Sequence, residues 1–218
     1  MFELQYEDEK SNAYFRSMNF PNLLTLSRIP LMLIVIGMLY PDPSQMWPGV
    51  RTGALLLFLF AALTDWLDGW LARKFGQVSE FGKFMDALAD KVLTMGMFVS
   101  LLALGALEKW TLFLILLVLS REFLITGLRL VAAAKGKTLA AEKIGKVKTV
   151  VQLLCISLFL AQLALEVDGT RILSPESNNY AVEILRWAGQ LTLIFATVLT
   201  VFSGIIYLVK YWKYFLDD

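Results

Sequence analysis

The chain has 218 residues, of which 57% are apolar, and its formal net charge is +1. Its mean hydropathy of +0.62 exceeds what a water-soluble domain of this length normally carries, so the composition excludes an ordinary soluble fold. Histidine is absent, and any proton transfer must therefore use a carboxylate, a lysine, a tyrosine or metal-bound water. No feature of the sequence indicates nucleic-acid binding.

Six apolar runs follow one another along the chain, and each nearly reaches or exceeds the roughly 20 residues that a helix needs to cross a bilayer. The predicted spans are residues 22–40, 51–74, 82–107, 109–134, 145–166 and 181–212. Proline and glycine at 41–50 predict an external turn, and 167–180 is predicted to be a polar external loop. The predicted fold class is an all-α integral membrane protein with six transmembrane helices, forming one membrane domain over residues 21–218.

The segment 1–20 precedes the first predicted span. Apolar residues such as Phe2, Tyr6 and Phe15, placed among charged ones, predict a short N-terminal interfacial helix. The segment lacks the basic start, short apolar core and small-residue cleavage site of a signal peptide, so no processing is expected.

The basic residues divide unequally between the two sides of a six-span topology. One side receives Lys10, Arg16, Arg73, Lys74, Lys83, Lys135, Lys137, Lys143, Lys146, Lys148, Lys210 and Lys213. The other side receives Arg51, Lys109, Arg171 and Arg186. Because cytoplasmic loops carry the excess of lysine and arginine, both termini are predicted to be cytoplasmic. The predicted location is the plasma (inner) membrane.

Four aspartates frame the connection between the second and third predicted spans. Asp65 and Asp68 are three residues apart, and Asp86 and Asp90 are four apart, so each pair lies on one face of its helix. Four ionised carboxylates that close would repel strongly unless they were protonated, paired with cations or bound to metal. Oxygen ligands of this hardness suit Mg²⁺ or Mn²⁺, and two such ions would form a clamp for displacement at phosphorus.

Simpler interpretations exist for single members of this region. One carboxylate at a helix end can sit in interfacial water, although four at facing helical spacings are poorly explained in that way. Gly69 and Ala72 can serve close helix packing in lipid, and taken singly each fits a packing role better than a ligand contact.

The same stretch carries a longer pattern of fixed spacing. It reads Asp65-x-x-Asp68-Gly69-x-x-Ala72-Arg73, then eight residues, Gly82, three residues, Asp86, three residues and Asp90. This pattern resembles the signature of the CDP-alcohol phosphatidyltransferase family at every defined position. The resemblance implies a six-helix membrane fold, usually a homodimer, with an active site that opens at the cytoplasmic membrane surface.

The resemblance also implies roles for individual residues. In the family the first three aspartates bind metal and the fourth lies nearby as the base that activates the attacking hydroxyl, which would be Asp90 here. The predicted metal set is therefore Asp65, Asp68 and Asp86, with Asp90 beside them as a further member. The residues implied for the CDP-lipid site are Asn22, Thr25, Asp68, Gly69, Ala72, Arg73 and Gly82. The small residues of this set would let the nucleotide approach the helix closely, and its arginine would contact the phosphates of the donor.

Charged residues inside the fourth predicted span indicate a second anion site. Arg121 and Glu122 lie near its middle, and Arg129 lies two turns nearer the cytoplasm. Lys146 and Lys148 follow at the start of the fifth span. Intramembrane cations need a partner or a hydrated cavity, so these four cations predict a pocket for the phosphate of an acceptor alcohol. An internal pair of Arg121 with Glu122 is the alternative, although neighbouring helical residues point about 100° apart and would pair poorly.

Three further segments indicate one branch of the family. They are Asn22-Leu-Leu-Thr25-Leu-Ser-Arg28, Ser120-Arg121-Glu122 and Gly145-Lys146-Val-Lys148-Thr149. These segments resemble those of phosphatidylglycerophosphate synthases, and the resemblance covers most of residues 20–155. It implies CDP-diacylglycerol and glycerol 3-phosphate as substrates, with phosphatidylglycerol phosphate and CMP as products.

Two other interpretations stay open on the sequence alone. A sibling enzyme with inositol phosphate, serine or phosphatidylglycerol as acceptor would share every aspartate. A cation transporter is disfavoured, because its polar residues should occur at several depths, whereas these aspartates gather at one membrane face.

Overall fold

The computed structural model describes residues 20–42, 47–75, 80–134, 143–171 and 173–212. Every regular element in these ranges is helical, as the apolar runs predict. The elements are α2 (Phe20–Leu39), α3 (Val50–Phe75), α4 (Glu80–Ala103), α5 (Thr111–Ala134), α6 (Lys143–Val167), the 3-10 helix η2 (Gly169–Arg171) and α7 (Pro175–Tyr211). The predicted interfacial helix lies outside the described residues, apart from its last position.

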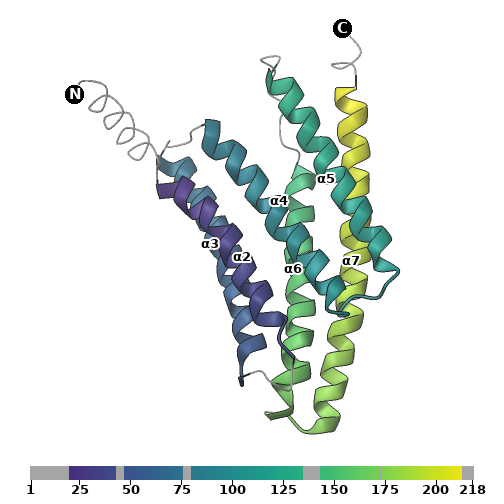
Figure 1. Ribbon diagram of the computed structural model, residues 1–218. Coiled ribbons are helices and arrows are strands. Elements are labelled where there is room, and N and C mark those ends of the chain that lie inside the picture. The colour runs from purple at the N-terminus through teal and green to yellow at the C-terminus, as the bar shows by residue number, and fades with distance from the viewer. Residues whose placement is uncertain (1–19, 43–46, 76–79, 135–142, 172, 213–218) are drawn as a thin grey trace, which may run out of the picture.

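The helix α6 is central to the bundle. It packs against α3, α4 and α7, while α2 packs against α3 and α4, and α5 packs against α4 and α7. Figure 1 shows that α3, α5 and α7 end, and α4 and α6 begin, at one end of the bundle. We call this the upper end, after its place in Figure 1. The predicted active-site segments from the second to the fifth span therefore converge on one end of the molecule.

Close-packed apolar side chains fill the interior of the bundle. Phe58, Phe98, Phe159 and Leu193, from four different helices, are each at most 1% exposed. Helices surrounded by lipid gain little from exclusion of water, so dispersion contacts between such side chains hold them together.

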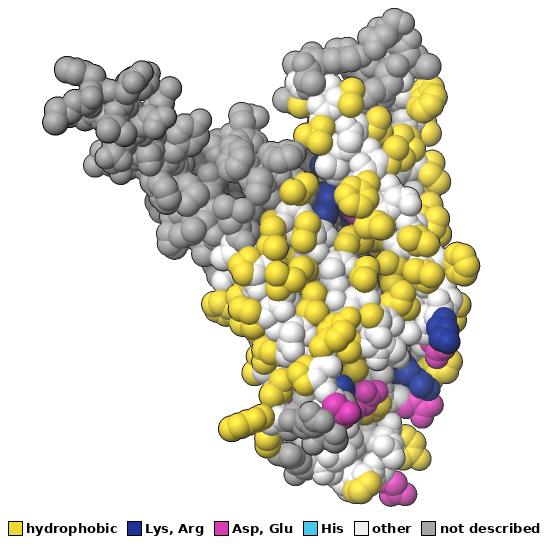
Figure 2. All heavy atoms as spheres, in the orientation of Figure 1, with side chains coloured by type: hydrophobic (Ala, Val, Ile, Leu, Met, Phe, Trp, Pro, Cys, Tyr) yellow, Lys and Arg dark blue, Asp and Glu magenta, His cyan; other side chains and the backbone are white. Residues whose placement is uncertain are grey.

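Large apolar side chains also cover the outside of the bundle. Figure 2 shows them over most of the visible face, while charged side chains gather toward its lower end. Phe113, Phe123, Trp187 and Phe202 are all more than half exposed. A monomeric soluble protein rarely exposes an apolar surface of this extent, whereas lipid chains match it.

Among the described residues, three helices are long and apolar enough to cross a membrane. They are Thr111–Ala133, Val147–Val167 and Pro175–Tyr211. Shorter apolar stretches, Ser27–Leu39, Val50–Thr64 and Lys91–Ala103, belong to α2, α3 and α4. The 37 residues of α7 extend about 55 Å, which exceeds the roughly 30 Å of a hydrocarbon core. These helices and the apolar surface identify a membrane protein.

The predicted end of the third span is wrong by several residues. The prediction continues the span to residue 107, but α4 ends at Ala103. Gly105 adopts a φ of 73°, and the N–H groups of Gly105 and Ala106 each bond to last-turn carbonyls at 3.1 Å. This glycine-based cap satisfies the terminal carbonyls and stops the helix before the apolar sequence ends.

The predicted polar loop at 167–180 is also too long. α7 begins at Pro175, and the Ser174 side chain accepts a hydrogen bond of 3.4 Å from the N–H of Ser177. A serine cap followed by proline at the first helical position favours a helix start here, and the acidic Glu176 matches the positive end of the helix dipole.

Asp168 connects the start of α3 to the end of α6. Its buried carboxylate accepts hydrogen bonds from the Gly49 N–H (2.8 Å), the Thr52 N–H (3.0 Å) and the Thr52 hydroxyl (2.7 Å). These bonds satisfy N–H groups that the first turn of a helix leaves without intrahelical partners. The contact fixes α3 against α6 at the lower end of the bundle.

Candidate functional site

The four aspartates belong to the upper end of the bundle. Asp65 and Asp68 lie in the last three turns of α3, and Asp86 and Asp90 lie in the first three turns of α4. Only residues 76–79 separate these helices in the sequence, and α2 packs against both. The side chains of all four aspartates lie outside the described residues, so the metal set stays a prediction.

The donor chemistry of this region fits a hard divalent cation. Helical backbone runs through both aspartate pairs, which preserves the spacings that put the two members of a pair on one face. Carboxylate oxygens are the ligands that Mg²⁺ and Mn²⁺ prefer. Among the described side chains, no other group of three or more cysteines, aspartates and glutamates is placed to hold a metal ion.

The other predicted members of the CDP-lipid site come from the same three helices. Asn22 and Thr25 belong to α2, Gly69, Ala72 and Arg73 to α3, and Gly82 to α4. Their side chains lie outside the described residues. Arg28, which the charge analysis did not single out, is buried on α2 at 4% exposure. A buried arginine therefore lies in the helix that contacts both aspartate-bearing helices.

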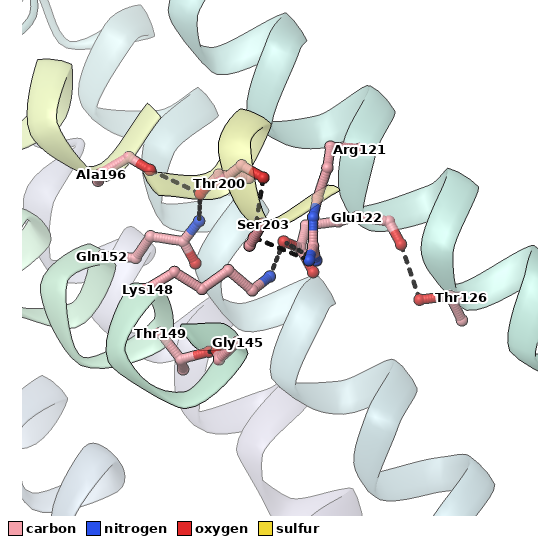
Figure 3. A network of polar contacts seen from close by, with 10 residues as sticks. All are labelled: Arg121, Glu122, Thr126, Gly145, Lys148, Thr149, Gln152, Ala196, Thr200 and Ser203. Carbon is pink, nitrogen blue, oxygen red and sulfur yellow. Dashed lines mark hydrogen bonds and ion pairs between the residues drawn. The ribbon is translucent and has the colours of Figure 1, made fainter. Parts of the chain in front are cut away.

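Two cations from different helices meet on one carboxylate (Figure 3). Lys148 of α6 forms an ion pair with Glu122 of α5, and Arg121 Nη1 lies 3.2 Å from the same oxygen, Glu122 Oε1. Lys148 and Glu122 are 5% and 7% exposed. A charge buried between apolar helices costs several kcal/mol when it is unpaired, so this arrangement explains how three charges are accommodated there.

The sequence argument against a pair between Arg121 and Glu122 is wrong. The two side chains leave the helix in different directions, but both are long enough to turn toward each other. Lys148 attracts the Glu122 carboxylate from the α6 side, and the Arg121 guanidinium reaches the same oxygen. The structure thus brings two of the four predicted acceptor-site cations together, and it does so through a shared carboxylate.

The remaining predicted cations are Arg129 and Lys146. Arg129 Nε lies 3.3 Å from the Tyr207 hydroxyl, and its guanidinium carbon is 5.2 Å from the centre of the same ring. Arg129 is two turns from Arg121, roughly 12 Å along α5, and its described contacts are with α7 rather than with Glu122. The Lys146 side chain lies outside the described residues.

The polar network continues onto α7 through residues that the sequence analysis missed. The Ser203 hydroxyl accepts a hydrogen bond from Arg121 Nη2 at 3.0 Å, and Gln152 Nε2 donates to the Thr200 hydroxyl at 3.3 Å. Ser203, Gln152 and Thr200 are each at most 3% exposed. The sequence spacing could have indicated these residues. Gln152 follows Lys148 by four residues and Ser203 follows Thr200 by three, so the two members of each pair share a helix face.

The helices thus carry the two aspartate pairs at the upper end of the bundle, and Arg121, Glu122 and Lys148 meet between α5 and α6. The family model described as CDP-alcohol phosphatidyltransferase matches residues 18–202. The chain belongs to that family.

Similar proteins cover almost the whole chain. One from Bacillus subtilis, CDP-diacylglycerol--glycerol-3-phosphate 3-phosphatidyltransferase, is 34% identical over 89% of this chain and 96% of its own length. A protein of the same name from Rickettsia felis is 33% identical over 90% of this chain and 97% of its own length. An Arabidopsis thaliana protein, named as the second such enzyme, is 29% identical over 90% of this chain and 81% of its own length.

Replacement of Glu122 by alanine should destabilise the fold. The change leaves Arg121 and Lys148 buried without their shared carboxylate, and removal of one partner from a buried ion pair costs about 3–5 kcal/mol. Thermal unfolding of the detergent-solubilised protein should show a lower midpoint, and the double variant Glu122→Ala with Lys148→Ala should recover part of the loss. Glu183→Ala, an exposed position on α7, is the control. An unchanged midpoint for Glu122→Ala would show that the pairing contributes nothing to stability.

Proposed function

We propose that this protein is an enzyme of phospholipid biosynthesis. It transfers the phosphatidyl group of CDP-diacylglycerol to sn-glycerol 3-phosphate and gives phosphatidylglycerol phosphate and CMP. The observation that carries the proposal is the similarity, over nearly the full length, to relatives named for that reaction. The meeting of Arg121 and Lys148 adds support, because two cations suit an acceptor that brings its own phosphate.

The CDP-lipid binds at the upper end of α2, α3 and α4. The proposed set is Asn22, Thr25, Asp68, Gly69, Ala72, Arg73 and Gly82. Arg73 pairs with phosphate oxygens of the donor, since a guanidinium matches phosphate geometry and keeps its charge at every physiological pH. Gly69 and Ala72 leave room for the nucleotide to lie against α3.

Asp65, Asp68, Asp86 and Asp90 hold two divalent ions, Mg²⁺ or Mn²⁺, in this proposal. When bound, the ions supply Lewis-acid stabilisation of the charge on the pyrophosphate oxygens. The four carboxylates fit this role because they come from two helices that α2 contacts together.

Asp90 accepts the proton of the acceptor hydroxyl. That oxygen then forms a bond to the phosphorus of the phosphatidyl group, and the bond from this phosphorus to the CMP oxygen breaks. CMP leaves with the electron pair, and Arg73 offsets the negative charge that develops on it. A carboxylate base is consistent with a chain that contains no histidine.

Arg121 and Lys148 bind the phosphate of glycerol 3-phosphate, with Arg129 and Lys146 as the further proposed members. Glu122 keeps the first two cations in place before the acceptor arrives. This phosphate does not react, so its contacts contribute about equally to the bound substrate and to the transition state. They should therefore lower the acceptor KM and leave kcat nearly unchanged.

The proposed setting is the plasma (inner) membrane, crossed six times, with both termini and the active site on the cytoplasmic side. The unequal distribution of lysine and arginine between the two sides supports this orientation. A homodimer is proposed from the family resemblance.

An acceptor panel tests the reaction itself. The purified protein is incubated with CDP-diacylglycerol and either glycerol 3-phosphate, glycerol, serine, inositol phosphate or phosphatidylglycerol, and CMP release is followed. Glycerol 3-phosphate should be used with the highest kcat/KM. Preference for another acceptor would assign the protein to a sibling activity, and no CMP release with any acceptor would refute the proposed transferase.

The metal set makes a prediction for three of its members. Asn at Asp65, Asp68 or Asp86 should reduce CMP release by orders of magnitude, because each change removes an anionic ligand, and excess Mg²⁺ should restore little. The exposed position Glu183 on α7 gives a control, Glu183→Gln, with unchanged activity. Full turnover of the unaltered protein in excess chelator would exclude the metal model.

The base assignment predicts a different defect at Asp90. Asp90→Asn should retain CDP-diacylglycerol binding and lose about 10²- to 10⁴-fold in kcat, which is typical for a lost proton acceptor. Donor binding, measured by titration, and single-turnover rates separate the two effects. If the variant binds the donor much more weakly but reacts at the normal rate once donor is saturating, Asp90 is a ligand and another group is the base.

The acceptor site predicts a KM effect at Lys148. Lys148→Ala should raise the KM for glycerol 3-phosphate by about 10- to 150-fold, corresponding to roughly 1.5–3 kcal/mol for a charge-assisted contact, and should spare the KM for the lipid donor. Lys210→Ala is the matched control, because this lysine lies on the exposed side of α7 beside Tyr211. An unchanged acceptor KM in Lys148→Ala, with glycerol accepted equally well, would show that the site does not recognise a phosphate.

A further inference from the structure

We infer that Ser203 and Gly204 of α7 are positioning residues for Arg121, so that the acceptor-phosphate site is built from three helices instead of two. The inference rests on the proposed function, in which Arg121 binds the phosphate of the acceptor. It adds α7, which none of the predicted site residues belong to, and it assigns a role to two small residues in an otherwise apolar stretch.

The Ser203 hydroxyl has a fixed direction. It donates a hydrogen bond of 3.0 Å to the carbonyl of Thr200 in its own helix, and it accepts one of 3.0 Å from Arg121 Nη2. A hydroxyl has one donor and two acceptor sites, so a donor bond made within the helix directs its lone pairs toward the guanidinium. Ser203 is only 1% exposed, and water competes little for this contact.

Gly204 makes room for the Arg121 side chain. A Cβ atom at position 204 would lie 2.8 Å from Arg121 Cγ and 3.3 Å from Arg121 Nε. A carbon that close must displace its neighbour, so the path of the arginine across α7 depends on the missing side chain. Ser203 thus binds the end of the side chain and Gly204 accommodates its stem.

The two ends of the guanidinium are held by different helices (Figure 3). Nη1 contacts Glu122 Oε1 on α5 at 3.2 Å, and Nη2 contacts Ser203 on α7. Two contacts at separate nitrogens fix the plane of the group. Arginine recognises phosphate through a planar fork of N–H donors, so the orientation of this plane decides how well an acceptor phosphate can bind.

The position of α7 relative to Lys148 is also fixed nearby. Gln152 of α6 donates to the Thr200 hydroxyl at 3.3 Å, and that hydroxyl donates to the Ala196 carbonyl at 2.6 Å. Gln152 is one turn from Lys148, and Thr200 is one turn from Ser203. α7 therefore contacts α6 close to Lys148 and contacts α5 at Arg121. Its position affects the separation between the two cations that the phosphate would meet.

Small residues in membrane helices commonly serve packing, which is the alternative explanation for Ser203 and Gly204. A packing role predicts a loss of stability without a selective effect on one substrate. A positioning role predicts a selective rise in the KM for glycerol 3-phosphate. The two explanations are separated by kinetics on both substrates together with thermal unfolding.

The test compares substitutions along α7 in the full-length, detergent-solubilised protein. Ser203→Ala should raise the KM for glycerol 3-phosphate by about 3- to 10-fold, the value of one ordinary hydrogen bond, because Ser203 acts on the phosphate only through Arg121, and it should leave the KM for CDP-diacylglycerol unchanged. Ser203→Thr, which retains a hydroxyl, should restore most of the acceptor affinity. Gly204→Ala should raise the acceptor KM at least as much, because it displaces the arginine stem.

Gly189→Ala is the control for packing on the same helix. Its Cβ would lie 2.9 Å from the Phe159 ring, so it should lower the unfolding midpoint while the acceptor KM stays normal. In an Arg121→Ala background, Ser203→Ala should have no further effect on the acceptor KM. A rise in acceptor KM for Arg121→Ala but not for Ser203→Ala overturns the inference and retains the proposed function. No rise for Arg121→Ala overturns the inference and removes Arg121 from the proposed acceptor site, whereas the proposed reaction itself fails only if the acceptor panel gives no CMP release.

Discussion

The low dielectric of helices packed in lipid sets a high cost on every unpaired charge. Glu122 forms ion pairs with both Arg121 of α5 and Lys148 of α6, so neither cation is buried without a partner. Because Arg121 also reaches Ser203 on α7, the same cluster of contacts connects α5, α6 and α7. In lipid the hydrophobic effect does not drive helices together, so close packing and interhelical polar contacts have to stabilise their association. The chemistry proposed for this cluster and its structural role therefore depend on the same charges.

The all-helical class could be predicted from apolar runs, because inside a bilayer the backbone can satisfy its hydrogen bonds only within a helix or a closed sheet. The span predicted at 109–134 is observed as Thr111–Ala134, within the accuracy that such runs allow. Larger deviations occur where one residue ends or starts a helix. Gly105 and Ser174 act through a single backbone conformation and a single side-chain cap, and a window of about 20 residues averages over such local effects.

The residue types of the candidate site were easier to predict than their contacts. Arg121 and Lys148 stand out in the sequence because a bilayer penalises charge. Ser203 and Gly204 do not, because small residues occur along many membrane helices. The wrong prediction that Arg121 and Glu122 would pair poorly also arose because the sequence does not show contacts between helices. Helix geometry fixes where side chains leave the backbone, but a third residue on another helix decides where their ends lie.

The hydrogen bonds of Asp168 have a consequence for how this chain can vary. Asp68 lies about 24 Å along α3 from Thr52, and Lys148 lies about 30 Å along α6 from Asp168, at 1.5 Å per residue. Both helices are therefore fixed at one end and carry proposed site residues toward the other. A residue inserted into α3 after Thr52 would leave the contact intact and yet turn the positions of Asp65 and Asp68 by about 100°. The lipid-facing positions of this stretch, such as Leu56 and Phe60, can accept changes of side chain, but the number of residues in the stretch must stay constant.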